Sequence, residues 1–311
     1  MSFDKLDYCA TLNNTRILEK CPNFTFEHGD ITSPNDVKRC LRKHKIDTIF
    51  HFAAQSHVNL SFGNSYQFTN TNVCGTHVLL EKARAHRIKR LVHISTDEVY
   101  GDVPADADDL SETSLLALTN PYSASKAAAE MMVNAYRKSF KLPVITVRSN
   151  NVYGPHQFPE SMQHSLPMLV AMVLMQLEII TKFALLLQRG SRLLVHGDVT
   201  PTRQYLYAGD IVDVLDTIFH KGNIGQIYNI ASKDEISNID ICHKLLELFE
   251  LPHSTPKQFN KWVEHTEDRP FNDHRYATDD TKLAVLGWQL KTSFDDGIQI
   301  TADWYRHFRE V

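Results

Sequence analysis

Short runs of β-branched and aromatic residues alternate with longer helical stretches in the first half of the chain, and this alternation restricts the possible folds more than any other feature. We expect strands at 24–27, 48–52, 91–95 and 144–148, and helices at 34–44, 66–86 and 120–140. Strands that alternate with helices form a parallel sheet covered by helices on both faces. The sequence therefore predicts an α/β fold with a Rossmann-like doubly wound parallel sheet, which binds ligands beyond the carboxyl ends of its strands.

The rhythm changes after Gly154-Pro155, where we expect a smaller α+β lobe that binds the substrate. A strand is predicted at 193–195, with helices near 238–250 and 295–309. The piece 205–230 again follows a strand-helix-strand pattern and is assigned to the first domain. The expected boundaries are 1–152 and about 203–232 for the first domain, and about 153–202 and 233–311 for the second lobe.

An apolar stretch at 161–178 interrupts the second lobe and contains four of the seven methionines, Met162, Met168, Met172 and Met175. A membrane anchor is one interpretation. Its uninterrupted apolar run is shorter than the roughly 18 residues that a spanning helix needs, and Glu178 follows closely. We therefore expect a buried or interface helix and no contact with a membrane.

Charge and cysteine content narrow the class of protein. The 33 basic and 37 acidic residues are mixed along the chain and give a net charge of -4, which argues against a nucleic-acid-coating protein. The five cysteines are scattered, without the paired spacing of a disulfide framework or a metal site, so no metal is expected. No basic and apolar leader opens the sequence, and we expect a cytoplasmic protein.

Tyr122 and Lys126 lie four residues apart on a helix predicted to begin near Asn120-Pro121, so their side chains share one face. We expect the lysine to favour the phenolate and to lower the pKa of the tyrosine, which would then act as a base toward a substrate hydroxyl. The same spacing arises by chance in many chains, and the pair alone is compatible with a structural role.

A threonine and two acids, Thr96-Asp97-Glu98, follow an apolar strand directly. Adjacent carboxyl groups at a strand end can supply an acid and a base to one substrate. The alternative is an ordinary solvated loop. The coincidence with Tyr122 favours catalysis.

The run Ser-Thr-Asp-Glu-Val-Tyr-Gly at 95–101, followed by Tyr122 and Lys126, resembles the signature of the dTDP-glucose 4,6-dehydratase family within the extended short-chain dehydrogenase/reductases. The segments 120–126 and 148–155 are similar to the family pattern, and 4–10 resembles its animal members. The Asp97-Glu98 pair argues against a 4-epimerase of the same superfamily.

The resemblance implies a three-step reaction on a nucleotide sugar. Tyr122 would take the proton of the C4 hydroxyl, with Thr96 hydrogen-bonded to the same oxygen, while the C4 hydride passes to NAD. Glu98 would remove the C5 proton and Asp97 would protonate the departing C6 hydroxyl. Return of the hydride to C6 would give a 4-keto-6-deoxy sugar nucleotide.

The resemblance also implies binding residues. For NAD, held by the first domain, the matching positions are Asp4, Lys5, Asp30, Ile31, Ala53, Ala54, Tyr122 and Lys126. For the substrate, with dTDP-glucose expected, they are Asn151, Arg203, Asn238 and Arg269. Asn238 could instead cap a helix, and Arg269 could form a surface ion pair. Helices 66–86 and 120–140 resemble the pair through which family members form homodimers.

Two departures from the family pattern stand out. The first glycine is Gly29, so the glycine-rich turn that approaches the cofactor pyrophosphate is missing together with the first β-α unit. We expect this to leave two interior strand edges unpaired. The apolar stretch at 161–178 is extra. Both departures fit mis-assigned exon boundaries, and the alternative is a catalytically impaired pseudoenzyme that binds a partner or nucleotide.

Overall fold

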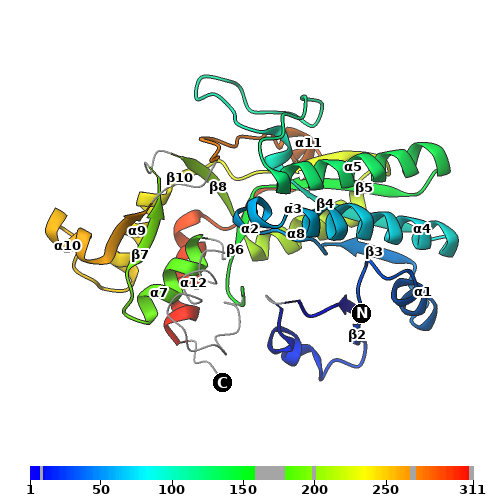
Figure 1. The fold of residues 1–311 in the computed structure, drawn as a ribbon, viewed down its shortest axis with the longest axis horizontal. Coiled ribbons are helices and arrows are strands. Elements are labelled where there is room, and N and C mark those ends of the chain that lie inside the picture. The colour runs from blue at the N-terminus through cyan, green and yellow to red at the C-terminus, as the bar shows by residue number, and fades with distance from the viewer. Residues whose placement is uncertain (8–9, 158–178, 198–200, 267–270, 308–311) are drawn as a thin grey trace.

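A computed structural model describes residues 1–7, 10–157, 179–197, 201–266 and 271–307. Its centre is a parallel sheet in the order β3-β4-β5-β9, drawn on the right in Figure 1. The strands are β3 (Thr48–His51), β4 (Arg90–Thr96), β5 (Val144–Ser149) and β9 (Ile227–Ile230). All neighbouring strands of this sheet are parallel, which confirms the predicted fold class and places the carboxyl ends of β4 and β5 side by side.

Helices cover both faces of this sheet because apolar residues of the strands alternate in direction. Leu91 packs with α1 (Pro34–Lys43), α4 (Thr76–His86) and α5 (Pro121–Phe140) in one cluster. The next residue, Val92, packs in a second cluster with α8 (Ala208–Lys221) and α11 (Thr281–Ala284). The first domain is therefore a three-layer structure held by two separate cores.

The predicted helix at 66–86 is divided. It consists of α3 (Ser65–Phe68), a π-helical stretch η2 (Thr69–Gly75) and α4. Asn72 in the π-helical stretch is buried, and its side chain accepts a hydrogen bond from the backbone N–H of Gln55 and donates to the Gln55 carbonyl and to Ser125 Oγ. The widened turn thus holds the loop after β3 against α5.

The N-terminal strand precedes the predicted alternation of strands and helices. β1 (Ser2–Asp4) pairs in parallel with β2 (Phe26–His28) to form a sheet of its own, and a 3-10 helix, η1 (Leu12–Leu18), lies between them in sequence. Within the described ranges β1 pairs only with β2 and β3 only with β4, so each has one edge without a ladder partner.

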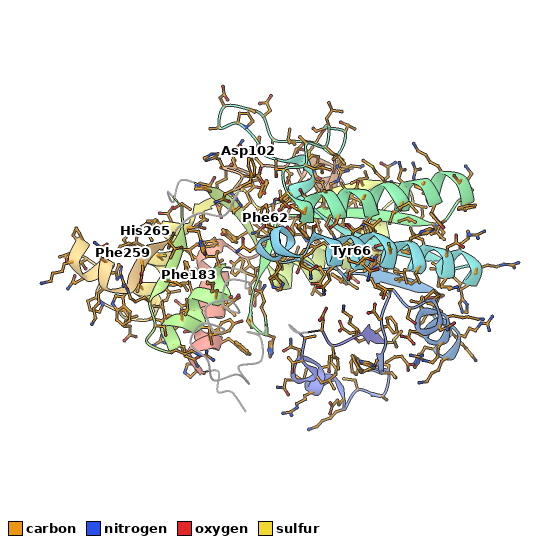
Figure 2. All side chains as sticks on the ribbon, viewed as in Figure 1. Phe62, Tyr66, Asp102, Phe183, Phe259 and His265 are labelled. Atoms are coloured by element: carbon orange, nitrogen blue, oxygen red, sulfur yellow. The ribbon has the colours of Figure 1, made fainter. Side chains whose placement is uncertain are left out.

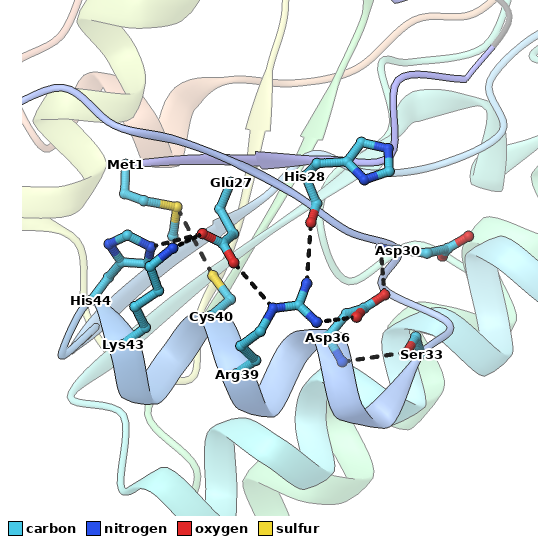
Figure 3. A network of polar contacts seen from close by, with 10 residues as sticks. All are labelled: Met1, Glu27, His28, Asp30, Ser33, Asp36, Arg39, Cys40, Lys43 and His44. Carbon is cyan, nitrogen blue, oxygen red and sulfur yellow. Dashed lines mark hydrogen bonds and ion pairs between the residues drawn. The ribbon is translucent and has the colours of Figure 1, made fainter.

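An ion cluster fastens β2 to α1 (Figure 3). Glu27 on β2 accepts hydrogen bonds from Arg39 Nε at 3.1 Å and from Lys43 Nζ at 2.6 Å, and His44 Nε2 lies 3.2 Å away. Hydrogen bonds from Lys43, His44 and Arg39, in that order of size, lower the pKa of Glu27 to about 2. The carboxylate therefore stays charged over the physiological pH range.

The second lobe lies on the left in Figure 1. It contains the parallel pair β7 (Leu193–His196) and β11 (Val263–Thr266), and a mixed sheet in the order β10-β8-β6. The strands of the mixed sheet are β6 (Asn151–Tyr153), β8 (Thr202–Tyr207) and β10 (Glu235–Ser237). Whereas β9 and α8 join the first domain, β8 pairs within this mixed sheet.

The core of the second lobe is formed by helices and strands that share one apolar cluster. Its helices are α7 (Ile179–Gln188), α9 (Asn238–Leu248), α10 (Pro256–Trp262) and α12 (Phe294–His307). Phe183 on α7, labelled in Figure 2, is fully buried in this cluster. The remaining short elements are α2 (Val58–Gly63) and the 3-10 helix η3 (Asp97–Tyr100).

The apolar stretch 161–178, Cys9 and Arg269 lie outside the described residues. Among the helices that are described, none combines the length and the apolar character that crossing a membrane requires. Cys21, Cys40, Cys74 and Cys242 are free thiols.

A buried ion pair joins α5 to β5. Arg148 donates to Glu130 through Nε at 3.1 Å and through Nη2, and its guanidinium lies 4.8 Å from the centre of the Tyr100 ring. Both members of the pair are less than a tenth exposed. Removing one charge would leave the other buried and unpaired, which costs more than losing an exposed pair.

We therefore predict that Glu130→Ala lowers the free energy of unfolding by roughly 3–5 kcal/mol in urea titrations. The matched control is Lys89→Ala, which removes the exposed pair between Lys89 and Asp47 and should leave stability nearly unchanged. Equal effects of the two substitutions would contradict this assignment.

Candidate active site

A cavity of about 630 Å³ lies between the two halves of the molecule. Its wall includes residues from the carboxyl ends of β4 and β5, from the first turns of α5, and from β7 and β8 of the second lobe. Phe62 on α2, labelled in Figure 2, forms part of the wall. The cavity thus occupies the position at which a parallel sheet of this kind binds ligands.

Tyr122 and Lys126 enter the cavity from the start of α5. The helix begins as predicted, with Asn120 as N-cap: its side chain accepts from the backbone N–H of Ser123, and the Ser123 hydroxyl reaches back to the N-cap backbone. Pro121 fits the first helical position because its missing N–H has no intrahelical partner there. One turn later Lys126 lies on the same face as Tyr122, and both are buried.

The prediction that Lys126 lowers the pKa of Tyr122 is wrong for the protein without a ligand. The ammonium of Lys126 donates to the carbonyl of Ile94 at 2.6 Å, and burial lowers its pKa to about 8. Burial raises the pKa of Tyr122, the charges of Glu98 and Asp97 raise it further, and only a hydrogen bond with Thr96 acts the other way. The neutral phenol is therefore the stable form of this side chain.

Asp97 begins η3 and is almost completely buried. Burial raises the pKa of its carboxyl group to about 6, although Asn150 donates to Oδ2 at 2.6 Å and Arg203 and Thr96 favour the charged form. A carboxyl group with this pKa carries a proton over part of the range near neutrality. Asp97 has the properties of a proton donor.

Glu98 has different surroundings from its neighbour. It is only half-buried and lines the cavity, its Oε2 accepts from Asn120 Nδ2 at 3.3 Å, and its backbone N–H donates to Thr96 Oγ1. Thr96 also lines the cavity. The turn after β4 therefore presents a buried acid and an accessible carboxylate beside one hydroxyl.

Arg203 projects into the cavity from β8 and is held by neutral acceptors. It donates to the carbonyls of Thr202, Asp273 and His274 and to Asn272 Oδ1, at 2.7 to 3.2 Å. Its guanidinium also lies 4.5 Å from the centre of the Tyr276 ring. Such bonds orient the group without cancelling its positive charge.

Two of the other three predicted substrate residues lie in the cavity wall. Asn151 and Asn238 line the cavity. The helix-capping alternative for Asn238 is wrong, because Ser237 is the N-cap of α9 and Asn238 is its first residue. Arg269 lies outside the described residues. The structure thus places three of the four predicted residues, Asn151, Arg203 and Asn238, in the cavity wall.

The predicted cofactor residues fall into two groups. Tyr122, Lys126 and Ala54 line the cavity. The others lie near the carboxyl ends of strands: Asp4 and Lys5 at β1, Asp30 and Ile31 after β2, and Ala53 after β3. β1 and β2 are parallel in their own sheet, and β3 is parallel to β4 in the central sheet, so within each pair the carboxyl ends lie at the same edge.

Several residues of the site had no assigned role in the sequence. Asn120 and Asn150 lie inside segments that resemble the family pattern, and they prove to bind the two carboxyl groups. Lys182, His196 and Tyr276 also line the cavity. Lys182 carried a detectable signal, because it is the one charged residue between Ile179 and Leu187.

The comparisons with known proteins agree with this geometry. The family model described as GDP-mannose 4,6 dehydratase matches residues 2–301. The dTDP-D-glucose 4,6-dehydratase of Homo sapiens is 40% identical, over 98% of this chain and 82% of its own length. The chain belongs to the nucleotide-sugar 4,6-dehydratase family. The predicted resemblance is thereby confirmed.

Two further relatives extend the comparison. A trifunctional UDP-glucose 4,6-dehydratase/UDP-4-keto-6-deoxy-D-glucose 3,5-epimerase/UDP-4-keto-L-rhamnose-reductase of Arabidopsis thaliana is 47% identical over 97% of the chain, which spans only 42% of that enzyme. The dTDP-glucose 4,6-dehydratase of Streptomyces venezuelae, solved with NAD bound, superimposes with a TM-score of 0.85 at 33% identity, covering 98% of this chain and 86% of that one. The chain shares the fold of this dehydratase.

The raised pKa of Asp97 predicts a pH-dependent cost in stability. Its folded pKa, about 6, exceeds the ordinary value of 3.8, so the folded state binds more protons between these two pH values and stability falls as pH rises through this window. Asp97→Asn removes the titration and keeps the shape. We predict that it stabilises the protein by roughly 2–3 kcal/mol at about pH 8 and by little at about pH 3.

Urea titrations of Asp97→Asn and the unsubstituted chain at the two pH values measure this difference. Asp106→Asn is the control, since it replaces an exposed carboxyl group and should show no such pH-dependent gain. A difference between Asp97→Asn and the unsubstituted chain that is the same at both pH values would contradict the raised pKa.

Proposed function

We propose that this chain catalyses the NAD-dependent 4,6-dehydration of a nucleoside-diphosphate glucose, with dTDP-glucose as the substrate, to a 4-keto-6-deoxy product. The observation that carries the proposal is the convergence of an acid with a raised pKa, a second carboxylate and a tyrosine on one cavity. These are the groups that a hydroxyl oxidation followed by loss of water requires. Membership of the dehydratase family supports the same reaction.

The described residues fit NAD at both of its ends. Toward the adenosine half, Asp4 and Asp30 supply carboxylates at neighbouring strand ends, and Lys5 Nζ lies 2.7 Å from Asp7 and 3.9 Å from Asp30. Toward the nicotinamide half, the hydroxyl of Ser95 is buried in the cavity wall and has no hydrogen-bond partner in the described part of the chain. When bound, NAD would accept the C4 hydride and return it to C6, and its positive ring would favour the Tyr122 phenolate.

Tyr122 is proposed as the base that removes the proton from the C4 hydroxyl. Its hydrogen bond with Thr96 places two hydroxyl groups where they would meet the same substrate oxygen. Lys126, one turn further along α5, would hold the local positive charge while its bond to the Ile94 carbonyl fixes its position. Thr96 and Lys126 would thus orient and stabilise the base.

The two carboxyl groups would then divide the elimination between them. The ketone formed at C4 acidifies the C5 proton, and Glu98, which lines the cavity, would remove it. Asp97 would give its proton to the departing C6 hydroxyl, which its raised pKa favours. Water would leave across the C5–C6 bond, and Glu98 would return its proton to C5 as the hydride returns to C6.

The second lobe would hold the nucleotide. Arg203, which is oriented by neutral acceptors, would bind the diphosphate, while Asn151, Asn238 and Arg269 would add polar contacts. Relatives that act on UDP-glucose and on dTDP-glucose both match nearly the whole chain. Assays should therefore include both sugar nucleotides.

We further propose that the protein acts in the cytoplasm as a homodimer, with α4 and α5 at the interface. The free thiols fit a reducing compartment. Met131 and Phe140 on the outer side of α5 are at least half exposed, which supplies apolar surface for a second copy. Light scattering on the purified chain measures the assembly directly.

Substitutions that act on different steps provide the test of the reaction. We predict that Tyr122→Phe lowers kcat by roughly 10²–10⁴-fold and yields no absorbance of reduced nicotinamide, because the first step is blocked. Asp97→Asn should lower product formation by a similar factor and yet permit that absorbance to rise, because oxidation precedes elimination. Both are measured with NAD and either sugar nucleotide.

Tyr66→Phe is the matched control, since Tyr66 is exposed on α3 and should retain full activity. Absence of NAD binding and of product with the unsubstituted chain would refute the proposal and favour a binding protein without catalysis.

A further inference from the structure

The cavity carries more positive than negative charge. Lys126, Lys182 and Arg203 line it. Glu98 is the only carboxylate among the described lining residues, and counting the buried Asp97 beside it still leaves an excess of one cation. Two of these cations have hydrogen-bond partners within the protein, because Lys126 donates to the Ile94 carbonyl and Arg203 donates to four acceptors.

Lys182 has no such partner among the residues that the structure describes. It lies on α7 between two fully buried residues, Thr181 and Phe183, and is only 5% exposed. No hydrogen bond or ion pair joins its ammonium to any residue in the described ranges, although its side chain reaches the cavity wall. Burial alone lowers its pKa to about 8.

A buried and unpaired ammonium is costly to a folded protein. Among the described residues Lys182 bridges no elements and balances no carboxylate, whereas Met or Leu would suit the apolar helix that carries it. An anion that enters the cavity would offset this cost. The second-lobe wall, with His196, Arg203 and Asn238, holds no described carboxylate that could compete for the lysine.

We propose that Lys182 binds the diphosphate of the nucleotide sugar together with Arg203, as a second cation supplied by α7. The inference rests on the proposed function, because it names a contact of that substrate. Two cations of different geometry suit a diphosphate: the planar guanidinium holds two oxygens, and the ammonium acts as a point charge. Lys182 would therefore determine affinity for the charged part of the ligand.

Calorimetry with dTDP, UDP and the uncharged nucleoside thymidine tests the proposal on the intact chain. Lys182→Met should weaken binding of the diphosphates roughly ten- to hundred-fold and change thymidine binding by less than about twofold. Lys182→Arg should restore most of the diphosphate affinity. Lys38→Met, at an exposed position of α1, is the matched control and should bind as the unsubstituted chain does.

Thermal unfolding separates this role from a structural one. Because the ammonium is buried without a partner in the described ranges, Lys182→Met should raise the melting temperature of the ligand-free protein, whereas substitution of a lysine needed for folding would lower it. Unchanged diphosphate affinity in Lys182→Met, or equal losses for dTDP and thymidine, would overturn the role of Lys182 alone. If the unsubstituted chain binds neither diphosphate, the proposed function fails together with it.

Discussion

The geometry of the candidate active site depends on the hydrogen bonds of the Asn120 side chain. Its side-chain oxygen caps α5 through the backbone N–H of Ser123, and its side-chain nitrogen donates to Glu98. The position of Tyr122, two residues into the helix, is thereby tied to that of the carboxylate. A cap of this kind contributes about 1 kcal/mol to helix stability. Here the same residue also sets the distance between two groups that would act on adjacent carbons of a substrate.

Burial is the main cause of the pKa shifts in this cavity. It raises the pKa values of Asp97 and Tyr122 and lowers those of Lys126 and Lys182. Each shift moves a group toward its neutral form, so burial weakens the preference of each group for its charged state. The protein thus gives up stability at the cavity and recovers it elsewhere, in the apolar clusters that cover both faces of the sheet.

The sequence predicted the sheet well because its signal is local. The alternation of Leu91 and Val92 between two cores follows from the period of a strand, and the start of α5 follows from Asn120-Pro121. The bond from Lys126 to the Ile94 carbonyl joins residues 32 apart and has no local signal. For the same reason the pKa of Tyr122 was predicted in the wrong direction: spacing shows that two side chains share a face, but burial decides what each one meets.

Main-chain carbonyls hold most of the Arg203 guanidinium in place. Three of its acceptors are main-chain carbonyls, which every residue type provides. Substitutions at Thr202, Asp273 or His274 would therefore leave the guanidinium oriented as long as the backbone keeps its path. The orientation of this cation is insulated from the identity of its neighbours, and selection could remodel the surrounding side chains without first rebuilding the bonds that orient the guanidinium.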